Sequence, residues 1–228
     1  MKFNFTGKTA LVTGVAVGIG RATAIMLAKN GAKVAVIDCN AELLEKAKKE
    51  LETYCDEVMA LQCDISDEAK ASETVKTIMD TFGRIDILVN NAAIWRCWGD
   101  WENISTDEWR KYLDVNVMGT VYITNAVRPK MKENNYGKII NVASVAGVYG
   151  NAYMPHYSAT KAAVIAMTKA LAKQVAQKGI CVNAVSPGTV SPAENEDMDY
   201  FTENSMPYMG RTGTDNENAS LICFLASD

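Results

Sequence analysis

The sequence has few of the residues that metal sites and disulfide scaffolds need. Histidine occurs once, as His156, among 228 residues, and the six cysteines are scattered without a C-x-x-C pair. Because zinc sites in proteins are usually built from histidines and closely spaced cysteines, we expect no metal centre. A chain of this length also buries a core without needing disulfide staples. All six cysteines are therefore expected to be reduced thiols.

A basic excess and long apolar runs are also missing. The formal net charge is −4, so no broad positive field is available to attract nucleic acid. No apolar run reaches the roughly 18 residues of a membrane span, and the first residues lead into a strand-like run without a signal peptide. We therefore expect a cytoplasmic protein with no nucleic-acid or membrane partner. With 48% hydrophobic and 22% charged residues, the composition is ordinary for one globular domain over residues 1–228.

Short apolar runs alternate along the chain with segments of helical periodicity. Strands are predicted over residues 8–13, 33–37, 57–63, 84–89, 138–143 and 180–186. Helices are predicted over residues 18–30, 41–54, 66–82 with Ser66 as N-cap, 105–132 with Ser105 as N-cap, 155–178 and 214–228 with Thr214 as N-cap. Apolar strands without alternation are typical of a parallel sheet buried on both faces. The prediction is a doubly wound α/β Rossmann fold, a three-layer α/β/α domain with strand order 3-2-1-4-5-6.

Glycines mark the first turn between a strand and a helix, in the pattern Thr13-Gly14-x-x-x-Gly18-x-Gly20. Glycine permits a tight turn and a close approach of the backbone to a pyrophosphate, and a helix N-terminus favours anions. A turn shaped by sterics alone would use the same residues, but it would not need to lie between a strand and a helix. The turn is therefore predicted to bind the phosphates of a dinucleotide.

Acidic and amide residues follow the next three strands. Asp38 ends the second strand, eighteen positions after Gly20, where a dinucleotide fold places the acid that binds the adenosine ribose. The alternative, a helix cap before residues 41–54, does not explain that distance. Asp64 is a candidate for the adenine edge, and the small and amide side chains from Asn90 to Ala93 would let a cofactor lie against the backbone.

A hydroxyl, a phenol and an ammonium occur together between Ser144 and Lys161. If residues 155–178 are helical, Tyr157 and Lys161 share one face, with Cβ atoms about 5–6 Å apart. A neighbouring ammonium favours the phenolate and so lowers the pKa of the phenol. Ser144, at a strand end, is placed to hydrogen-bond a substrate oxygen. The three groups suit carbonyl reduction or alcohol oxidation, although Tyr-x-x-x-Lys alone also occurs on ordinary amphipathic helices.

Three further features bear on the site. Trp95, Trp98 and Trp101 fall within seven residues of a predicted loop, where they either pack locally or shape a substrate pocket. Asn116 lies inside a predicted helix, where an amide is unfavourable by propensity; it either packs against its neighbours or holds a water for a proton relay. The acidic segment 189–211 is predicted to be a mobile lid.

Together these motifs resemble those of the short-chain dehydrogenase/reductase family over essentially the whole chain. The matching residues are Thr13 to Gly20, Asp64, Asn90-Asn91-Ala92, Asn116, Ser144, Tyr157 to Lys161 and Pro187-Gly188. The resemblance implies that Tyr157 is the acid/base and that Lys161 lowers its pKa and holds the nicotinamide ribose. It also implies that Ser144 orients the substrate oxygen and that Asn116 supports a water-linked proton relay.

From this resemblance we expect a set of contacts for each ligand. The dinucleotide is expected to contact Gly14, Val17, Gly18, Ile19, Gly20, Asp38, Asp64, Ile65, Asn91, Ala92, Tyr157, Lys161, Pro187, Gly188, Thr189 and Val190. The substrate is expected to contact Trp95, Val145, Tyr149 and Met154. The family resemblance also implies a homotetramer or homodimer, with Ala163, Ala166 and Met167 available on the outer face of helix 155–178.

The chain departs from the family pattern in three places. Ala93 replaces the usual glycine, Thr189 to Pro192 leave the usual nicotinamide contact unassigned, and the sequence stops at Asp228 where relatives continue into a seventh strand. A strand at 180–186 would then form a sheet edge carrying the apolar Val182 and Val185, and bare edges of this kind are rare. We therefore expect that the chain is a fragment or that another segment covers this edge.

The leading hypothesis is an oxidoreductase that moves hydride between NAD(H) and a secondary alcohol or ketone. NAD is preferred to NADP because Asp38 would repel a 2′-phosphate and its neighbours Val15 and Cys39 are uncharged. One alternative is a 3-oxoacyl-[acyl-carrier-protein] reductase, with Arg128, Lys130 and Lys132 as a docking patch. An alternative of another class is a dinucleotide-binding regulator without turnover.

Overall fold

A six-stranded parallel sheet in the order β3-β2-β1-β4-β5-β6 forms the centre of the molecule. The computed structural model describes residues 3–190 and 210–228. The strands are β1 (Thr9–Thr13), β2 (Lys33–Asp38), β3 (Val58–Gln62), β4 (Ile87–Asn90), β5 (Gly137–Val142) and β6 (Ile180–Val185). The helices are α1 (Gly18–Lys29), α2 (Ala41–Leu51), α3 (Glu68–Phe82), α4 (Thr106–Leu113), α5 (Thr120–Asn134), α6 (Ala146–Tyr149), α7 (Pro155–Val175) and α8 (Asp215–Ala226). The predicted fold class and strand order are confirmed.

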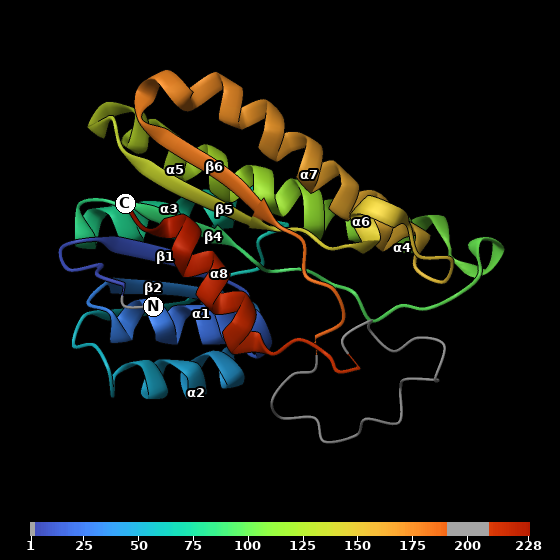
Figure 1. Cartoon of the computed structure of the whole chain (residues 1–228), viewed down its shortest axis with the longest axis horizontal. Coiled ribbons are helices and arrows are strands. Elements are labelled where there is room, and N and C mark those ends of the chain that lie inside the picture. The colour runs from blue at the N-terminus through green and yellow to red at the C-terminus, as the bar shows by residue number, and fades with distance from the viewer. Residues whose placement is uncertain (1–2, 191–209) are drawn as a thin grey trace.

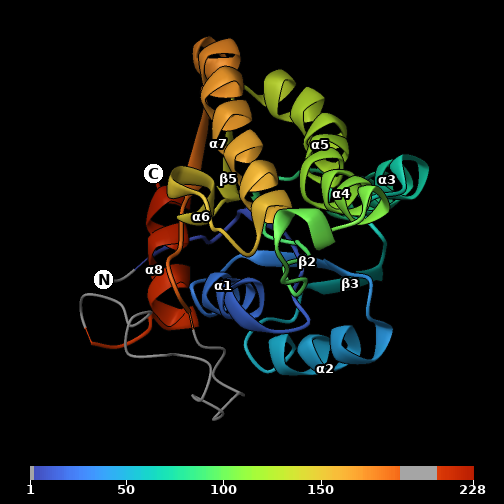
Figure 2. The ribbon, with the colours of Figure 1, turned by 90° about the vertical axis from the view of Figure 1, so that its right-hand side faces the viewer.

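Helices cover both faces of the sheet, and each face has its own apolar core (Figures 1 and 2). On one face, Leu27 of α1, Leu44 of α2 and Ile222 of α8 pack against the strands. On the other face, α3, α5 and α7 bury a second cluster that includes Ile78 and Ile123. The inner strands carry apolar side chains on both faces because both faces are covered, which explains the lack of alternation in the sequence.

Two predicted helix boundaries are wrong, each for a local reason. Ser66 does not cap α3; the cap is Asp67, whose carboxylate accepts from Lys70 N at 3.1 Å, while the Ser66 hydroxyl donates to Asp64 at 2.7 Å. The predicted helix 105–132 begins after Ser105 as expected, but it is not one continuous α-helix. A π-helical segment, η2 (Asp114–Gly119), separates α4 from α5.

The remaining boundaries differ from the predicted ones by a few residues. α2 ends at Leu51, earlier than the predicted Tyr54, and its N-cap is Asn40, so Asp38 is not that helix cap. The predicted helix 155–178 divides into α7 and the short 3-10 turn η3 (Ala176–Lys178). Thr214 caps α8 with the reciprocal Thr214–Glu217 capping box that the sequence predicts.

Within the described residues, β6 is the outer strand of the sheet next to β5. Its apolar residues are nevertheless covered, since Val182 and Val185 are 7% and 4% exposed. α7 packs along this strand, and α8 also contacts it. The helices therefore bury the side chains on the faces of β6, and the covering of its backbone edge by another segment stays a prediction.

All six cysteines lie in the described part of the chain, and all six are free thiols. In residues 3–190 and 210–228 no cluster of three histidine, cysteine or acidic residues is arranged to hold a metal ion. None of the helices in these residues is long and apolar enough to cross a membrane.

Candidate active site

The candidate residues gather at one edge of the sheet because all its strands run parallel. The Gly14 turn follows β1, Asp38 ends β2, Asn91 follows β4 and Ser144 follows β5. Pro187 lies two residues beyond the end of β6 and joins this group, since its carbonyl accepts from Val145 N at 3.0 Å. In a doubly wound sheet this carboxyl edge is where ligands bind.

The glycine-rich turn has the backbone geometry that its glycines predict. Gly14 and Gly18 have φ of 71° and 70°, in the left-handed region that favours glycine. A Cβ on Gly14 would lie 2.6 Å from the Cα of Ala92, and one on Gly20 would lie 2.1 Å from the carbonyl oxygen of Gly14. The turn is thus closely packed against the segment after β4, so larger side chains do not fit at Gly14 or Gly20.

The N-terminus of α1 has no side-chain cap, as at α5 and α7 and unlike α2, α3, α4 and α8. Side chains of Asn40, Asp67, Ser105 and Thr214 cap α2, α3, α4 and α8. The N-cap of α1 is Val17, which supplies no side-chain hydrogen bond and is 38% exposed. The first N–H groups of a helix need an acceptor, and the helix dipole favours an anionic one. This end therefore fits the pyrophosphate of a dinucleotide, with Ile19 in its first turn.

Asp38 is buried where it supports the same turn. Its Oδ2 accepts a hydrogen bond from Ala16 N at 2.8 Å, and its Oδ1 accepts one from Asn40 N at 2.9 Å. The carboxylate therefore joins the glycine-rich turn to the start of α2. This is the position expected for an acid that binds a ribose, and the structure adds a second role in ordering the turn.

Thr13 and Asn91 fix the turn to the end of β4. The Thr13 hydroxyl accepts from the backbone N–H groups of Asn91 and Ala92, both at 3.1 Å. The Asn91 amide donates to the carbonyls of Thr13 and Gly14 at 3.0 and 2.7 Å. Sequence reasoning did not assign Thr13 a function, although its place next to the first glycine was a usable signal.

Ser144, Tyr157 and Lys161 come together from the end of β5 and the first turns of α7. Lys161 is 3% exposed, and its Nζ donates to the carbonyl of Val142 at 2.7 Å. The same Nζ lies 5.6 Å from the centroid of the Tyr157 ring. The helical spacing predicted for the pair is confirmed, and the lysine faces the sheet.

The protonation of these groups is set first by burial. Burial lowers the pKa of Lys161 to about 8. Burial raises the pKa of Tyr157, and a hydrogen bond with Ser144 opposes this rise. The expected lowering of the phenol pKa is therefore not seen in this structure, because the half-buried phenol is partly desolvated and the ammonium of Lys161 binds a backbone carbonyl instead of the phenol oxygen.

Asn116 occupies the π-helical segment η2 and is 1% exposed. Its side chain accepts from Ile94 N at 2.8 Å and donates to Ile94 O at 3.0 Å and to the Thr160 hydroxyl at 3.1 Å. Thr160 in turn donates to the carbonyl of Tyr157 at 2.7 Å. Of the two readings left open, the contacts match packing against neighbours, and they link Asn116 to the helix that carries Tyr157.

Gly147, which sequence reasoning missed, and Asn90, which it placed beside the cofactor, hold this region together. Gly147 lets α6 approach α7, because a Cβ there would lie 2.6 Å from Ala162 N and 2.9 Å from the Cβ of Lys161. Asn90 donates to the Thr124 hydroxyl at 3.0 Å and to Asn141 at 2.9 Å, which joins β4 to α5 and β5. A polar residue inside an apolar strand was the signal for Asn90, whereas no sequence pattern distinguishes Gly147.

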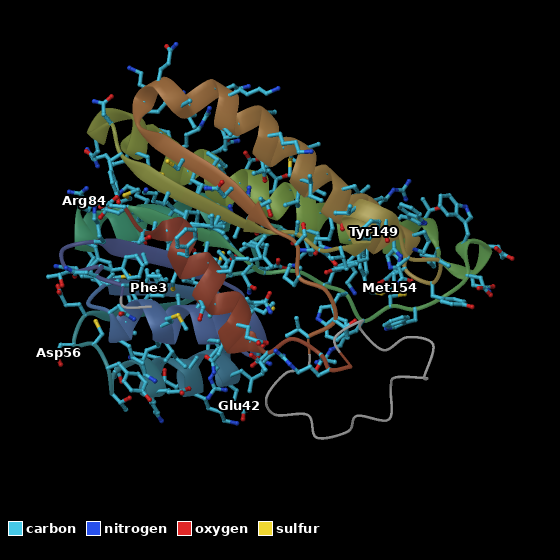
Figure 3. The ribbon with its side chains drawn as sticks, viewed as in Figure 1. Phe3, Glu42, Asp56, Arg84, Tyr149 and Met154 are labelled. Atoms are coloured by element: carbon cyan, nitrogen blue, oxygen red, sulfur yellow. The ribbon has the colours of Figure 1, made fainter. Side chains whose placement is uncertain are left out.

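The candidate substrate residues are two aromatic and two aliphatic side chains that differ in exposure. Tyr149 is 85% exposed, and Figure 3 shows it near Met154 and far from Arg84. Val145 and Trp95 are 37% and 43% exposed, whereas Met154 is 5% exposed. Met154 is thus less accessible than the other three. Gly99 N donates to the Tyr153 carbonyl at 3.0 Å. This bond joins the loop that carries Trp95, Trp98 and Trp101, here called the tryptophan loop, to the segment before α7.

The other residues expected to contact the dinucleotide lie just after the ends of β3 and β6. Asp64 is exposed, and its carboxylate accepts from Ser66, while the buried Ile65 packs against Gly119. Thr189 accepts from Gly213 N at 2.9 Å, and a cavity of about 350 Å³ is lined by residues on both sides of this contact, including Gly188 and Val190. The predicted lid 189–211 falls mostly on residues 191–209, outside the described part of the chain.

A family model described as short chain dehydrogenase matches residues 8–200. The chain belongs to this family. Short-chain dehydrogenases are oxidoreductases that bind a nicotinamide dinucleotide and act on CH–OH or C=O groups of small molecules, and the turn, the uncapped α1 and the Ser144–Tyr157–Lys161 group fit that chemistry.

Curated relatives of this family match over nearly the full length of both chains. The 3-oxoacyl-[acyl-carrier-protein] reductase of Thermotoga maritima is 39% identical and is aligned over 97% of this chain and 91% of its own. The 2-dehydro-3-deoxy-L-rhamnonate dehydrogenase (NAD(+)) of a Sphingomonas strain is 36% identical, over 98% and 90%.

Solved structures agree with the sequence matches. An NAD+-bound xylitol dehydrogenase superposes with a TM-score of 0.91 at 34% identity, covering 98% of this chain and 94% of its own. A levodione reductase superposes with a TM-score of 0.90 at 32% identity, covering 99% and 92%. By name, these similar proteins act on xylitol, levodione, 2-dehydro-3-deoxy-L-rhamnonate and 3-oxoacyl-[acyl-carrier-protein].

Proposed function

We propose that this protein is an NAD(H)-dependent oxidoreductase that interconverts a secondary alcohol and a ketone, with Tyr157 as the acid/base. The observation that carries the proposal is the meeting of two features at one sheet edge. The Ser144–Tyr157–Lys161 group lies at the ends of β5 and α7, and the glycine-rich turn with the uncapped α1 lies beside it. When bound, the nicotinamide supplies or accepts the hydride.

In this mechanism the chain's own residues handle the proton and the oxygen. In the reductive direction the Tyr157 hydroxyl gives its proton to the substrate oxygen, and in the oxidative direction Tyr157 takes it back. Ser144 donates a hydrogen bond to the same oxygen. Lys161 is assigned to the nicotinamide ribose and to stabilising the phenolate. Asn116 positions the helix that carries Tyr157 through its hydrogen bonds with Ile94 and Thr160.

The raised pKa of Tyr157 bears on how the proton moves. A buried phenol is a poor base at neutral pH, so the positive charge of Lys161 has to act on the phenolate as it forms. Because burial lowers the pKa of Lys161 only to about 8, the lysine still carries most of its charge at neutral pH. The pair therefore retains the charge that the acid/base role requires.

The coenzyme preference for NAD rests on the surroundings of Asp38. The carboxylate lies buried at the end of β2, and the residues around it, Val15 and Cys39, carry no positive charge. A 2′-phosphate placed there would meet like charge without a cation to balance it. The Sphingomonas relative and the xylitol dehydrogenase, both named with NAD, support the same choice. The dinucleotide would extend from Asp64 and Ile65 to Pro187, Gly188, Thr189 and Val190.

The substrate is proposed to be a small uncharged alcohol or ketone. Trp95, Val145 and Tyr149 offer exposed apolar surface, whereas Met154 is almost fully buried. Apolar walls with a few polar groups are typical of pockets for such ligands. The acidic segment 189–211 stays our prediction for a lid over this surface, and a cytoplasmic location also stays a prediction.

A 3-oxoacyl-[acyl-carrier-protein] reductase is the second candidate, and the names of the relatives favour it. The docking patch proposed for it is weaker in the structure. The Nε of Arg128 is buried in a cavity of about 170 Å³ between α5 and α7, and Lys130 forms an ion pair with Glu133 at 2.8 Å. A non-catalytic regulator would have no need for Ser144, Tyr157 and Lys161 together.

The deciding experiment measures the ultraviolet absorbance of reduced nicotinamide during turnover. The substrates are a polyol, a cyclic diketone, a sugar acid and a 3-oxoacyl thioester, each with NAD(H) and NADP(H). Turnover of one of the first three with NAD(H) is expected. Turnover of the thioester alone would assign the second candidate. Tight NADH binding by calorimetry without turnover on any of them would support the regulator.

A further inference from the structure

The only histidine of the chain is buried next to the candidate acid/base. His156 is 0% exposed and directly precedes Tyr157 in the first turn of α7. Neither of its ring nitrogens has a hydrogen-bond partner within residues 3–190 and 210–228. A buried polar group without a partner costs about 1–3 kcal/mol, so the placement of His156 calls for an explanation.

Aromatic rings surround the imidazole. The Tyr112 ring meets it edge-on with centroids 4.0 Å apart, and the Trp109 ring does so at 5.9 Å. Trp109 in turn contacts Trp101 edge-on at 5.2 Å. His156, Tyr112, Trp109 and Trp101 thus form one cluster, which we name the aromatic box.

The aromatic box joins the tryptophan loop to the catalytic helix. Trp101 belongs to the short turn η1 (Trp101–Asn103), at the end of that loop. The Tyr112 hydroxyl accepts from Cys97 N at 3.0 Å, in the middle of the loop. The loop therefore reaches α7 through α4 and His156, one residue from Tyr157.

The aromatic box suits only the uncharged imidazole. Imidazolium has two N–H donors and a full charge, whereas neither ring nitrogen of His156 reaches an acceptor within the described residues and the ring is shielded from solvent. The titratable groups facing it are Glu108 and Tyr112 from α4, Cys97 from the loop and Tyr157 on α7 itself. Burial lowers the pKa of His156 from 6.5, and only partial compensation comes from the Glu108 carboxylate.

We propose that His156 is a positioning residue whose neutral ring holds the tryptophan loop and α7 together around Tyr157. Its protonation expels the ring from the aromatic box, so the substrate side of the candidate site opens reversibly in mild acid. The unfolded chain binds this proton more readily than the folded one does. Stability therefore falls as the pH drops below 6.5 toward the folded-state pKa. The inference rests on the proposed function only where it concerns turnover.

The composition of the chain makes the titration directly visible. Because the chain has one histidine, protein labelled with ¹³C at the histidine Cε1 gives one imidazole resonance. We expect the chemical shift of this resonance to titrate with a midpoint below pH 6.5, and a titration midpoint at or above pH 6.5 would overturn the proposal. All four tryptophans lie between residues 95 and 109, so their fluorescence reports on the loop and α4 alone. We expect that emission to change with the same midpoint.

Two variants separate the proposed switch from general acid effects. His156→Phe keeps a ring of similar size but cannot titrate, so its fluorescence should stay constant where that of the wild type changes, and any measured turnover should persist to lower pH. An unchanged acid transition in this variant would refute the proposal.

If far-ultraviolet circular dichroism shows that His156→Phe does not fold, Glu108→Gln provides the test. Loss of that carboxylate should move the wild-type midpoint to lower pH, and an unmoved midpoint would count against the idea.

Discussion

Lys161 keeps an ammonium in the protein interior, where it has one carbonyl partner at 2.7 Å and little contact with solvent. Burying such a charge costs several kcal/mol unless it is compensated. Close to it, Tyr157 is held in a buried site that disfavours its own ionisation. Each residue is unfavourable alone, but a phenolate formed beside the ammonium would relieve both. This arrangement favours transient proton transfer over a permanently ionised phenol.

Tyr157→Phe tests the acid/base role directly. The variant keeps the ring and its burial but removes the proton, so turnover should fall by roughly 10²–10⁴-fold, while NADH binding should be unchanged. Stopped substrate assays and calorimetric titration with NADH measure the two effects. Wild-type turnover in this variant would exclude Tyr157 as the acid/base.

The coenzyme preference is tested at Cys39, next to Asp38. We expect kcat/KM with NADH to exceed that with NADPH by more than about tenfold, because unit charges about 4 Å apart repel by about 4 kcal/mol at an effective dielectric near 20, before screening. Cys39 is exposed, so Cys39→Arg adds a cation while keeping the two backbone hydrogen bonds that Asp38 accepts. This variant should raise kcat/KM for NADPH.

The control for that experiment is Asp38→Ser. It removes the negative charge, but it also leaves Ala16 N and Asn40 N without their carboxylate, so stability should fall by roughly 1–3 kcal/mol. Equal kcat/KM values for NADH and NADPH in the wild type would show that the carboxylate does not set the preference.

Spacing in the sequence predicted which residues meet, but not what surrounds them. The four-residue interval of Tyr157 and Lys161 and the eighteen-residue interval from Gly20 to Asp38 follow from regular backbone geometry. The pKa of Tyr157 depends on burial by residues distant in sequence, which no local pattern encodes. The same holds for the second role of Asp38 in ordering the glycine-rich turn.

At the scale of elements, the strand order and most helix ends were predictable because apolar runs and caps are local signals. The division of the predicted helix 105–132 was not, since no proline or glycine precedes η2 to mark it. There the long-range bonds from Asn116 to Ile94 and Thr160 determine the backbone. A π-helical segment at a functional side chain is a recurrent departure of this kind.

The contact between α6 and α7 gives a prediction at this scale. Gly147→Ala places a Cβ 2.6 Å from the backbone N of Ala162, which cannot move without shifting the helix that carries Lys161. We expect a loss of about 1–3 kcal/mol in the free energy of unfolding and a marked loss of turnover. Denaturant unfolding and steady-state assays measure these effects.

Gly99→Ala is the matched control for Gly147→Ala. A Cβ on Gly99 would meet its nearest atom at 3.6 Å, an ordinary contact, and stability should be nearly unchanged. If the two variants unfold alike, the close approach of α6 to α7 is not important for the fold.

For the whole molecule, the outer face of α5 and α7 is the proposed assembly surface. Ala166 is exposed, Ala163 and Met167 are half-buried, and Met167 lines the cavity of about 170 Å³ that contains the buried Nε of Arg128. That nitrogen has no hydrogen-bond partner within the described residues. A second copy packed on this face would cover the cavity and the side chains that line it.

Light scattering tests this assembly. We expect a homotetramer or homodimer at micromolar concentration, well above the 24.8 kDa of one chain. Ala166→Glu should reduce the mass, because it buries a charge in the contact. Lys49→Glu, on the exposed surface of α2, should leave the mass unchanged. A single-chain mass for the wild type would disprove the assembly.

The two hydrogen bonds of Asp38 limit the order in which this chain could change its coenzyme during evolution. Losing the carboxylate first would disorder the glycine-rich turn before any phosphate contact existed, so that path passes through a poorly folded ancestor. A cation gained first at the exposed Cys39 would be tolerated, since that side chain takes no part in those two bonds. Descendants that use both coenzymes are therefore expected to keep the acid and add a neighbouring base.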